Sequence, residues 1–415
     1  MAVTQVDVRV KASHAAAVMF VLCGLFHFSQ YAARSAPGVM LPELSLNLSI
    51  ATASLGSLIG SYYYTYSLTS VVAGGVLDRF GARVPVAVGM LMLATGCVMF
   101  SNSHYFIALL GRLLQGAGAA FAFTGAVYIA TRSFPAAQLA SAIGIVQAFG
   151  MFGGSAGQYA VAHMVHQFSL PWLYIWYGLA GLLLALAITL FFQREARAPL
   201  ATAPSPEKKN PLDGYRVVFG NPQSWLCGIC AGLLFIPTTV GDMIWRVAFF
   251  TEGLGIAYQD AVTSVALVLF GWVIGCPLLG WVSDRLQRRK PVVIGGAIAL
   301  LAAECAIVFG PAHLADNLVL SLFFGIVSGA AMIPYTMIKE ANPAEVAGTA
   351  TGIMNLLVFA TSALISPIAS ALYRHAGQID GGHALQFRGI GLLMIACAAG
   401  AIVLALLLKE KPAQR

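Results

Sequence analysis

Long, uninterrupted runs of apolar residues constrain what this chain can fold into more than any other feature. Residues 177–192 and 390–408 are two such runs, and others follow one another along the sequence. A helix needs about 20 apolar residues to cross the hydrocarbon core of a bilayer. Because the runs show no alternation of polar and apolar residues, they favour membrane-spanning helices over a β-barrel.

Composition supports a helical membrane protein. Only 9% of the residues are charged, whereas soluble domains carry about 25% charged residues. The mean hydropathy of +0.81 leaves too little polar surface for a soluble particle of 415 residues. The 43 glycines and 18 prolines agree with this interpretation, because membrane helices tolerate both. These values exclude a cytosolic enzyme, a disordered regulator and a secreted disulfide scaffold, and we predict that the protein is not an enzyme.

The apolar runs predict twelve spans in two groups of six. The spans are expected near residues 14–34, 52–74, 84–101, 105–131, 138–160, 171–193, 224–250, 258–282, 291–310, 316–338, 347–373 and 389–408. A longer segment rich in charge and proline separates the sixth span from the seventh. The sequence therefore predicts an all-α membrane protein with an N-terminal six-helix bundle (1–193), a linker (194–221) and a C-terminal six-helix bundle (222–415).

The positions of lysine and arginine predict the orientation. Most of the 23 lysines and arginines fall in the N-terminal segment, the linker, the C-terminal tail and the loops of one side. Only Arg374 and Arg388 fall on the other side, and Arg34, Arg112 and Arg246 lie inside spans. Positively charged loops remain in the cytoplasm, so we expect both termini and the linker to be cytoplasmic, in a bacterial inner membrane. Topology explains the net charge of +7, and we expect no nucleic-acid partner.

Two local patterns have ordinary explanations. The apolar segment after Arg9 and Lys11 resembles a signal peptide, but its removal would leave eleven spans, so we expect no cleavage. Cys227 and Cys230 form a C-x-x-C pair inside a span, without a nearby histidine or second pair, so we expect them to pack rather than bind metal. We predict no metal and no cofactor. No nucleotide-binding loop of the G-x-x-x-x-G-K-[ST] type occurs.

One loop motif occurs twice, at corresponding places in the two groups of spans. Gly74, Asp78, Arg79 and Arg83 follow the second span, and Gly280, Asp284, Arg285 and Arg289 follow the eighth, both in the pattern G-x-x-x-D-R with a further arginine five residues after the aspartate. The fourth span adds Arg112-Leu-Leu-Gln-Gly-Ala-Gly-Ala-Ala. Two six-span halves with these motifs resemble the major facilitator superfamily over essentially the whole chain.

This resemblance implies a secondary transporter whose halves rock about a central cavity that holds the substrate near the membrane midplane. It implies that Asp78 is a conformational latch, facing the cytoplasmic start of the eleventh span. A carboxylate gains roughly 0.3–1 kcal/mol at a helix N-terminus. The second copy of the motif has Gln287 where the first has Gly81, which suggests a looser latch. The alternative is a charge cluster that only sets topology.

The fifth span departs from the drug/proton antiporter branch of that superfamily. Antiporters carry a Gly-Pro pair there, whereas Gly150-Met-Phe-Gly-Gly-Ser-Ala-Gly lacks proline. This difference favours uptake over export. The segment Tyr31-Ala-Ala-Arg34-Ser-Ala-Pro, followed by the tyrosines of residues 62–66, is similar to bacterial carriers of organic anions and to relatives of dipeptide carriers.

Five ionisable residues other than histidine lie inside predicted spans: Arg34, Arg112, Asp242, Arg246 and Glu304. Each costs at least about 2.5–3.5 kcal/mol at a helix centre, so such residues usually face a cavity or a partner. Asp242 precedes Arg246 by four residues, which places both on one helix face, as Gln30 does for Arg34. The alternatives are arginines that snorkel to the interface and, for Arg112, a hydrogen-bonding hub to backbone carbonyls.

These considerations give three sets of candidate residues. We expect the substrate to contact Gln30, Tyr31, Arg34, Tyr62, Tyr63, Tyr66, Arg112, Arg246 and Asn355; Asp242, His27 and Glu304 are candidates for proton coupling; the repeated loop motif supplies the latch. Packing is the alternative explanation for His27, the tyrosines and Glu304.

An excess of arginine in the cavity favours anions. We therefore expect a small organic anion to be taken up with protons, by a monomer in the lipid bilayer. The alternatives are a carrier of zwitterions such as dipeptides, with Asp242 on the amine; an exporter of drugs or siderophores; a channel; and a membrane receptor that senses ligand without transport.

Overall fold

The computed structural model describes residues 2–133, 136–165, 167–191, 213–310, 314–343, 346–376 and 383–410. Helices and short connections account for all of them, without a strand. The first half contains α1 (Ala2–Ser35), the 3₁₀-helix η1 (Ala36–Val39), α2 (Leu41–Leu48), α3 (Thr52–Gly60), α4 (Tyr62–Phe80), α5 (Arg83–Phe100), α6 (Tyr105–Ser133), α7 (Ala136–Met164) and α8 (Leu170–Phe191).

The second half begins with the short helix α9 (Asp213–Phe219). It continues with α10 (Pro222–Ile236), the π-helix η2 (Pro237–Trp245), α11 (Arg246–Ala248), the π-helix η3 (Phe249–Gly253), α12 (Tyr258–Leu286), α13 (Lys290–Phe309), α14 (Leu314–Ser328), the 3₁₀-helix η4 (Gly329–Met332), α15 (Ile333–Ala341), α16 (Ala347–Ala376) and α17 (His383–Leu407). Helix therefore lies over each of the twelve ranges in which a span is expected.

Nine helices in the described ranges are long and apolar enough to cross a membrane. A tenth is obtained if α2 and the α3–α4 segment, which meet at 98°, are counted as one bent span. The spans expected at 14–34 and 138–160 correspond to α1 and α7, which are not among these. Two helices of the structure are additions to the expectation, since α2 lies between two expected spans and α9 lies within the expected linker.

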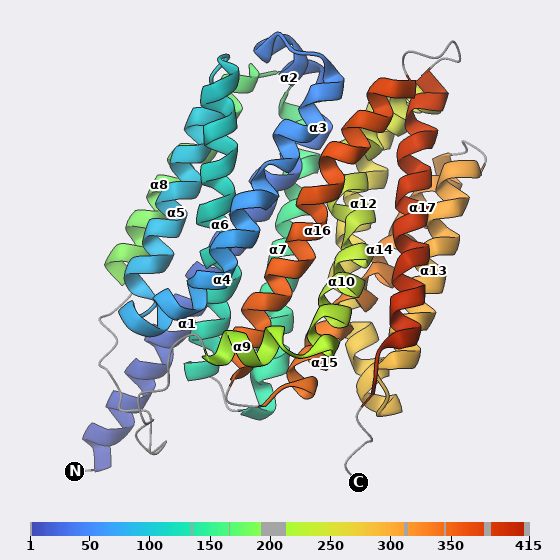
Figure 1. The fold of residues 1–415 in the computed structure, drawn as a ribbon. Coiled ribbons are helices and arrows are strands. Elements are labelled where there is room, and N and C mark those ends of the chain that lie inside the picture. Colours follow the sequence, from blue (N-terminus) through green and yellow to red (C-terminus); the bar gives the residue numbers. More distant parts are fainter. Residues whose placement is uncertain are drawn as a thin grey trace.

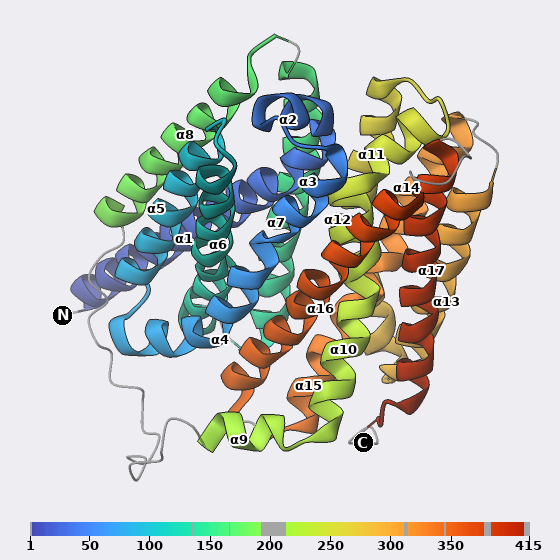
Figure 2. The same ribbon diagram turned by 45° about the horizontal axis from the view of Figure 1, so that its top comes forward.

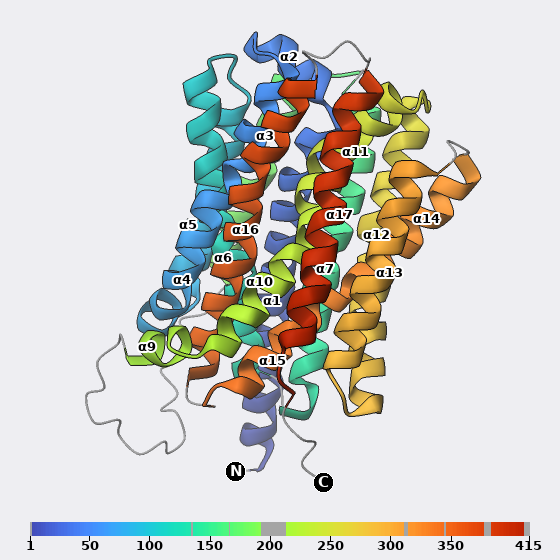
Figure 3. The ribbon, with the colours of Figure 1, turned by 45° about the vertical axis from the view of Figure 1, so that its right-hand side comes forward.

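The helices form two groups that stand side by side (Figure 1). Helices α1 to α8 make up one group and α10 to α17 the other, and the groups meet where α4 runs along α16 and α7 runs along α12. The start of α1, the end of α17 and α9 lie at one end of the molecule, and α2 lies at the opposite end (Figures 1 and 3). The tilted view shows α9 apart from the long helices, below α10 and α16 (Figure 2).

Glycines in and directly before the fourth-span motif allow α6 to approach its neighbours. A Cβ on Gly111 would lie 2.7 Å from the Gly96 carbonyl oxygen of α5, and one on Gly118 would lie 2.8 Å from the Leu93 nitrogen. Gly116 packs against the Tyr62 carbonyl, where a Cβ would overlap it. Small residues let membrane helices pack backbone to backbone. The motif thus fixes α6 against α4 and α5, which positions Arg112 in the interior.

Two of the long helices continue into irregular helical segments. Pro37 starts the 3₁₀ turn at the end of α1, and Pro237 starts the π-helix that follows α10. Proline lacks the amide hydrogen that a regular helix uses at that position, and π segments often occur at functional sites. The π-helix η2 is fully buried. It carries Asp242 and directly precedes Arg246.

Candidate functional site

A small pocket lies between the two groups of helices. Its lining comes from α1, α4, α6 and α7 on one side and from α10, η4, α15 and α16 on the other: His27, Tyr31, Tyr66, Phe123, Gln147, Phe235, Met332, Tyr335, Asn355 and Phe359. Four predicted site residues, His27, Tyr31, Tyr66 and Asn355, thus lie around one pocket. A solute held here would contact both groups at once.

Arg34 lies beside this pocket without a hydrogen-bond acceptor. Its side chain is 1% exposed, and none of its three guanidinium nitrogens has a partner in the described part of the structure. The guanidinium carbon is 3.7 Å from the centre of the Tyr31 ring. Tyr62 and Tyr63 are each 5.9 Å away, and Phe359 of α16 is 5.6 Å away. Arg34 is therefore caged by aromatic rings and keeps its donors free for an anion.

Hydrogen bonds hold the aromatic cage in place. The Tyr62 hydroxyl donates to Gln30 Oε1 (2.7 Å), and Gln30 Nε2 is 3.3 Å from His27 Nδ1. Gln147 Nε2 donates to the Tyr31 hydroxyl (3.2 Å). The Tyr63 hydroxyl donates to the Thr239 carbonyl of η2 (3.0 Å) and so reaches the other group of helices. Gln30 is expected to contact the substrate, and in the structure its side chain binds Tyr62 and lies beside His27.

Two further polar groups of the pocket lack partners. Asn355 accepts a hydrogen bond from the Tyr335 hydroxyl at 2.9 Å, but its Nδ2 has no acceptor among the described residues. His27 Nε2 is likewise buried without a partner there. Buried polar groups are almost always hydrogen-bonded. Donors that are left free on both sides of one pocket are therefore a feature that a bound anion would complete.

The environment of Arg112 differs from that of Arg34, because the donors of Arg112 are hydrogen-bonded within the protein. Its Nε donates to the Ile59 carbonyl (3.1 Å), Nη1 to the Ala33 carbonyl (3.2 Å) and Gln115 Oε1 (2.8 Å), and Nη2 to the Arg34 carbonyl (2.9 Å). These bonds join α6 to the end of α1 and to the break between α3 and α4. The geometry favours the hydrogen-bonding hub, which was the alternative to substrate contact, and it makes Arg112 a positioning residue for Arg34.

The two groups of helices contact each other at both ends of the pocket. At the end near α2, Ser366 Oγ of α16 donates to the Gly56 carbonyl of α3 (2.9 Å), and the Tyr258 hydroxyl donates to the Val39 carbonyl (2.5 Å). At the opposite end, the Tyr215 hydroxyl of α9 donates to the Val71 carbonyl of α4 (2.9 Å). Hydrogen bonds between the two halves of the chain thus lie on both sides of the pocket.

Arg246 lies in a second pocket, inside the second group of helices. Its Nε donates to Asp242 Oδ1 (2.8 Å) and its Nη2 donates to Glu304 Oε2 of α13 (2.6 Å). The pocket is lined by Gly241, Trp245, Arg246, Phe249, Glu304, Val308, Phe387, Ile390, Gly391 and Met394. It shares no lining residue with the first pocket. The structure therefore brings Asp242, Arg246 and Glu304 together, but apart from Arg34.

The two loop motifs can be described to different extents. The side chains of Asp78 and Arg79 lie outside the described part of the structure. The contact of Asp78 with the start of the eleventh span therefore remains a prediction. Arg83 donates to the Thr189 carbonyl at the end of α8, from Nε at 3.1 Å and Nη2 at 2.8 Å. Gly81 caps α4 with φ of 73°, a conformation that favours glycine.

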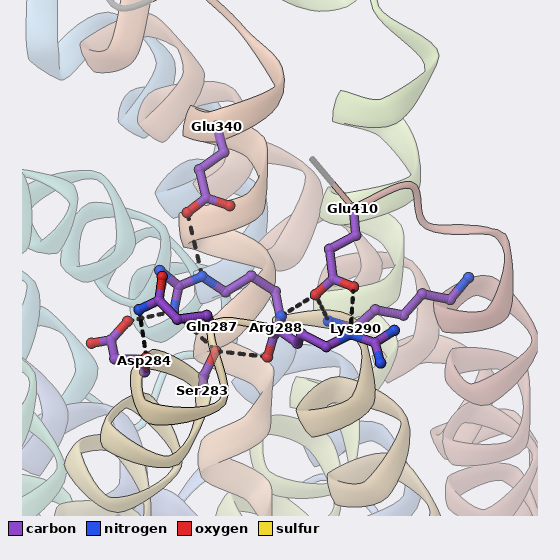
Figure 4. A network of polar contacts seen from close by, with 8 residues as sticks. Ser283, Asp284, Gln287, Arg288, Lys290, Glu340 and Glu410 are labelled. Carbon is purple, nitrogen blue, oxygen red and sulfur yellow. Dashed lines mark hydrogen bonds and ion pairs between the residues drawn. The ribbon is translucent and has the colours of Figure 1, made fainter. Parts of the chain in front are cut away.

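The second loop forms a network at the ends of four helices (Figure 4). Arg289 pairs with Asp284 and, at 3.3 Å, with Glu340 of α15. Glu410, beyond α17, accepts from the Lys290 amide (3.0 Å). Gln287 takes the left-handed conformation (φ 51°) that glycine usually provides, and its side chain donates to the Asp284 carbonyl (2.7 Å). All of these partners belong to the second group of helices. Gly280 has open space around its Cβ position, and Arg285 stacks on Trp281 (5.3 Å).

Six of the ten residues that line the central pocket were not predicted from the sequence. Gln147 on α7, Phe235 on α10, Tyr335 on α15 and Phe359 on α16 carry no charge and no motif, so nothing distinguished them from packing residues. A polar residue inside an apolar run was the available signal for Gln147. The aromatic residues could have been found only from the three-dimensional arrangement.

A bundle of apolar helices with a closed pocket between two groups, lined by polar and aromatic side chains, is the architecture of a membrane carrier. Residues 23–367 match the family model described as Major Facilitator Superfamily. The chain belongs to this superfamily, and it is a membrane transporter by family rather than an enzyme. This confirms the resemblance that the loop motifs indicate.

Curated relatives are similar over most of their length. A probable sulfoacetate transporter of Cupriavidus necator is 23% identical, covering 98% of this chain and 97% of the relative. A hexuronate transporter of Bacillus subtilis is 23% identical (81% and 83% covered). A membrane sensor protein of Escherichia coli is 26% identical (84% and 83% covered).

Solved structures show the same fold. A bacterial homolog of the human lysosomal transporter Spinster, in an inward-facing and unoccupied conformation, superposes with a TM-score of 0.68 at 18% identity, covering 95% of this chain and 96% of the other. The nucleoside transporter NupG superposes with a TM-score of 0.71 at 13% identity, covering 94% and 100%. At these identities the likeness concerns the fold alone.

Proposed function

We propose that this protein carries a small organic anion across the bacterial inner membrane, by uptake together with protons. Twelve membrane helices in two six-helix bundles, residues 1–193 and 222–415, rock about the central pocket. The linker 194–221 and both termini lie in the cytoplasm. The protein works as a monomer.

One observation carries the anion assignment: Arg34 is buried, and none of its guanidinium donors has a partner among the residues that the structure describes. An unpaired charge inside a protein destabilises the fold, and a bound partner of opposite charge offsets this loss of free energy. Rings beside a guanidinium compensate part of the charge by cation–π attraction. A carboxylate or sulfonate can accept two of its N–H groups side by side, which is the geometry that arginine provides best.

The other group of helices can complete the site. Asn355 offers a free amide donor across the pocket from Tyr31, and Phe359 of the same helix closes the cage around Arg34. An anion held by Arg34 would therefore contact donors of both bundles only when the pocket is closed. Such a contact would stabilise the closed state, which a carrier passes through in each cycle. Relatives named for sulfoacetate and hexuronate are in keeping with a small anionic solute.

The zwitterion alternative is weaker, because Asp242, the expected partner of an amine, lies in the other pocket. Export of drugs or siderophores is disfavoured by the small size of the pocket and by the missing proline of the fifth span. A receptor that senses an anion without transport has support from the similarity to a membrane sensor protein.

Arg34 substitutions test the anion assignment. We expect sulfoacetate, glucuronate or a related small carboxylate to raise the melting temperature of the purified protein, and Arg34→Ala to abolish that shift. The matched control is Arg216→Ala, which removes an exposed arginine of α9 and should leave the shift unchanged. A full ligand shift in Arg34→Ala would contradict the proposal. Uptake by vesicles under a proton gradient, collapsed by a protonophore, separates a carrier from a receptor and a channel.

A further inference from the structure

The pocket of the second group of helices holds an unusual charge cluster. Asp242 of η2 and Glu304 of α13 both pair with the single guanidinium of Arg246. The side chains of both acids are 0% exposed, and that of Arg246 is 5% exposed. Asp242 Oδ2 and Glu304 Oε1 have no hydrogen-bond partner within the described residues. The cluster thus contains two carboxyl groups, one cation and two unused carboxylate oxygens.

We propose that this cluster is a proton-binding site separate from the substrate pocket. If both carboxyl groups were ionised, the cluster would hold one uncompensated negative charge in an apolar interior, which is strongly disfavoured. One bound proton neutralises that charge. It converts one carboxylate to a carboxylic acid and leaves the other carboxylate paired with Arg246. Binding and release involve a proton only, and no electron moves.

The described residues that line the cluster supply no second cation. The helix α14 contributes Phe324, whose ring centre is 5.5 Å from the Arg246 guanidinium. The helix α17 contributes Phe387, Ile390 and Met394, and Tyr373 of α16 stacks on Trp245 (4.9 Å). On the side of α12, the Trp272 indole donates to Thr238 (3.1 Å). The charged groups that face the cluster are therefore its own three members, and their balance decides the protonation.

The π-helix connects this cluster to the anion site. Asp242 lies on η2 between Thr239 and Met243, and the Tyr63 hydroxyl bonds to the Thr239 carbonyl (3.0 Å) and approaches Met243 Sδ (3.9 Å). Tyr63 is also one wall of the cage around Arg34. When the cluster gains or loses a proton, the strength of the Asp242–Arg246 pair changes. A resulting shift of η2 would move Thr239 and Met243, which lie within one helical turn of Asp242, and with them Tyr63. Its role in coupled uptake rests on the proposed function, whereas proton binding itself does not.

Infrared spectroscopy of the purified, full-length protein without any substrate tests the proton site. We expect wild type to show the carbonyl band of a protonated, buried carboxyl group that titrates with pH and shifts in heavy water. Glu304→Gln and Asp242→Asn should each remove the band, because one acid then balances one arginine. Asp284→Asn, which changes an exposed ion-paired acid of the α12–α13 loop, is the matched control and should keep it.

The outcomes are separable from those for the anion site. A band that persists in both Glu304→Gln and Asp242→Asn, or is missing from wild type, overturns the proton site. Arg34→Ala should keep the band while it loses the anion. If instead Arg34→Ala binds the anion normally, the proposed function fails and the proton site stands. A wild-type spectrum without the band overturns the proton site even if neither variant folds, and one folded variant is enough to assign a band that is present.

Discussion

Two buried arginines of the same bundle show how environment decides the role of a residue. Arg112 donates four hydrogen bonds to three backbone carbonyls and one amide oxygen, whereas Arg34 donates none within the described residues. Both contact the Tyr62 ring, at 4.9 and 5.9 Å. The protein itself satisfies the guanidinium of Arg112, whereas the donors of Arg34 stay unpaired within the described residues.

This contrast predicts that substitution of Arg112 lowers the stability of the protein, whereas substitution of Arg34 affects ligand binding and leaves stability unchanged. Arg112→Ala leaves the carbonyls of Ile59, Ala33 and Arg34 without a donor, and hydrogen bonds between membrane helices contribute about 0.6 kcal/mol each on average. We expect a loss of about 2 kcal/mol of stability, seen as a fall of several degrees in the melting temperature of the detergent-purified protein. Arg34→Ala should keep its melting temperature without ligand. An Arg112→Ala variant as stable as wild type would contradict the role of Arg112 as a hydrogen-bonding hub.

The sequence identified charged residues of the site, but not the partners that they contact on other helices. Each intramembrane charge was visible as a break in an apolar run, and the four-residue spacing predicted the Asp242–Arg246 pair. Glu304 is 58 positions from Arg246, and no periodicity links two positions on different helices. For the same reason the sequence placed Arg34 and Arg246 around one cavity, whereas the structure shows two pockets.

At the scale of helices, the expected ranges and the structure agree because apolar length alone marks a span. Local irregularity was less visible. Pro37 and Pro237 were present in the sequence, but a proline does not specify whether a 3₁₀-helix, a π-helix or a kink follows. The helix α9 was hidden in a polar linker, where seven residues give too short a pattern to recognise.

The contacts at the two ends of the pocket predict opposite effects of two substitutions. A Cβ on Gly60 of α3 would overlap the side chain of Ser366, so Gly60→Ala should separate α3 from α16 and open the end near α2. Tyr215→Phe removes the bond from α9 to the Val71 carbonyl and should open the opposite end. In intact cells, an Asn355→Cys reporter in a background without the seven native cysteines would measure access for a membrane-impermeant maleimide.

We expect Gly60→Ala to raise labelling of the reporter and Tyr215→Phe to lower it. Gly75→Ala is the control, because a Cβ at Gly75 meets nothing within 4 Å. Equal labelling of all three variants would show that these two contacts do not control access to the pocket.

At the scale of the whole molecule, charge and shape point to the same orientation. The end of α12, the loop after it and the start of α13 carry Arg285, Arg288, Arg289 and Lys290. Helix α9, with Arg216, lies at the same end as the start of α1 and the end of α17 (Figure 1). Arg374 lies near the end of α16, at the other end of the molecule. Because positive loops are retained in the cytoplasm, we expect the end of the molecule with α9 and both termini to face the cytoplasm.

Reporter tags test this orientation and the even number of spans together. A tag inserted at residue 205 in the linker and one at the C-terminus should both report the cytoplasm, because the expected six spans of the second bundle return the chain to the side from which it started. A tag at residue 380, between α16 and α17, should report the outside, since one span separates it from the C-terminus. Opposite reports from 205 and the C-terminus would require an odd number of spans in the second bundle. The two bundles could then not be matching six-span halves related by an axis along the membrane normal, and the placement of the central pocket between such halves would lose its basis.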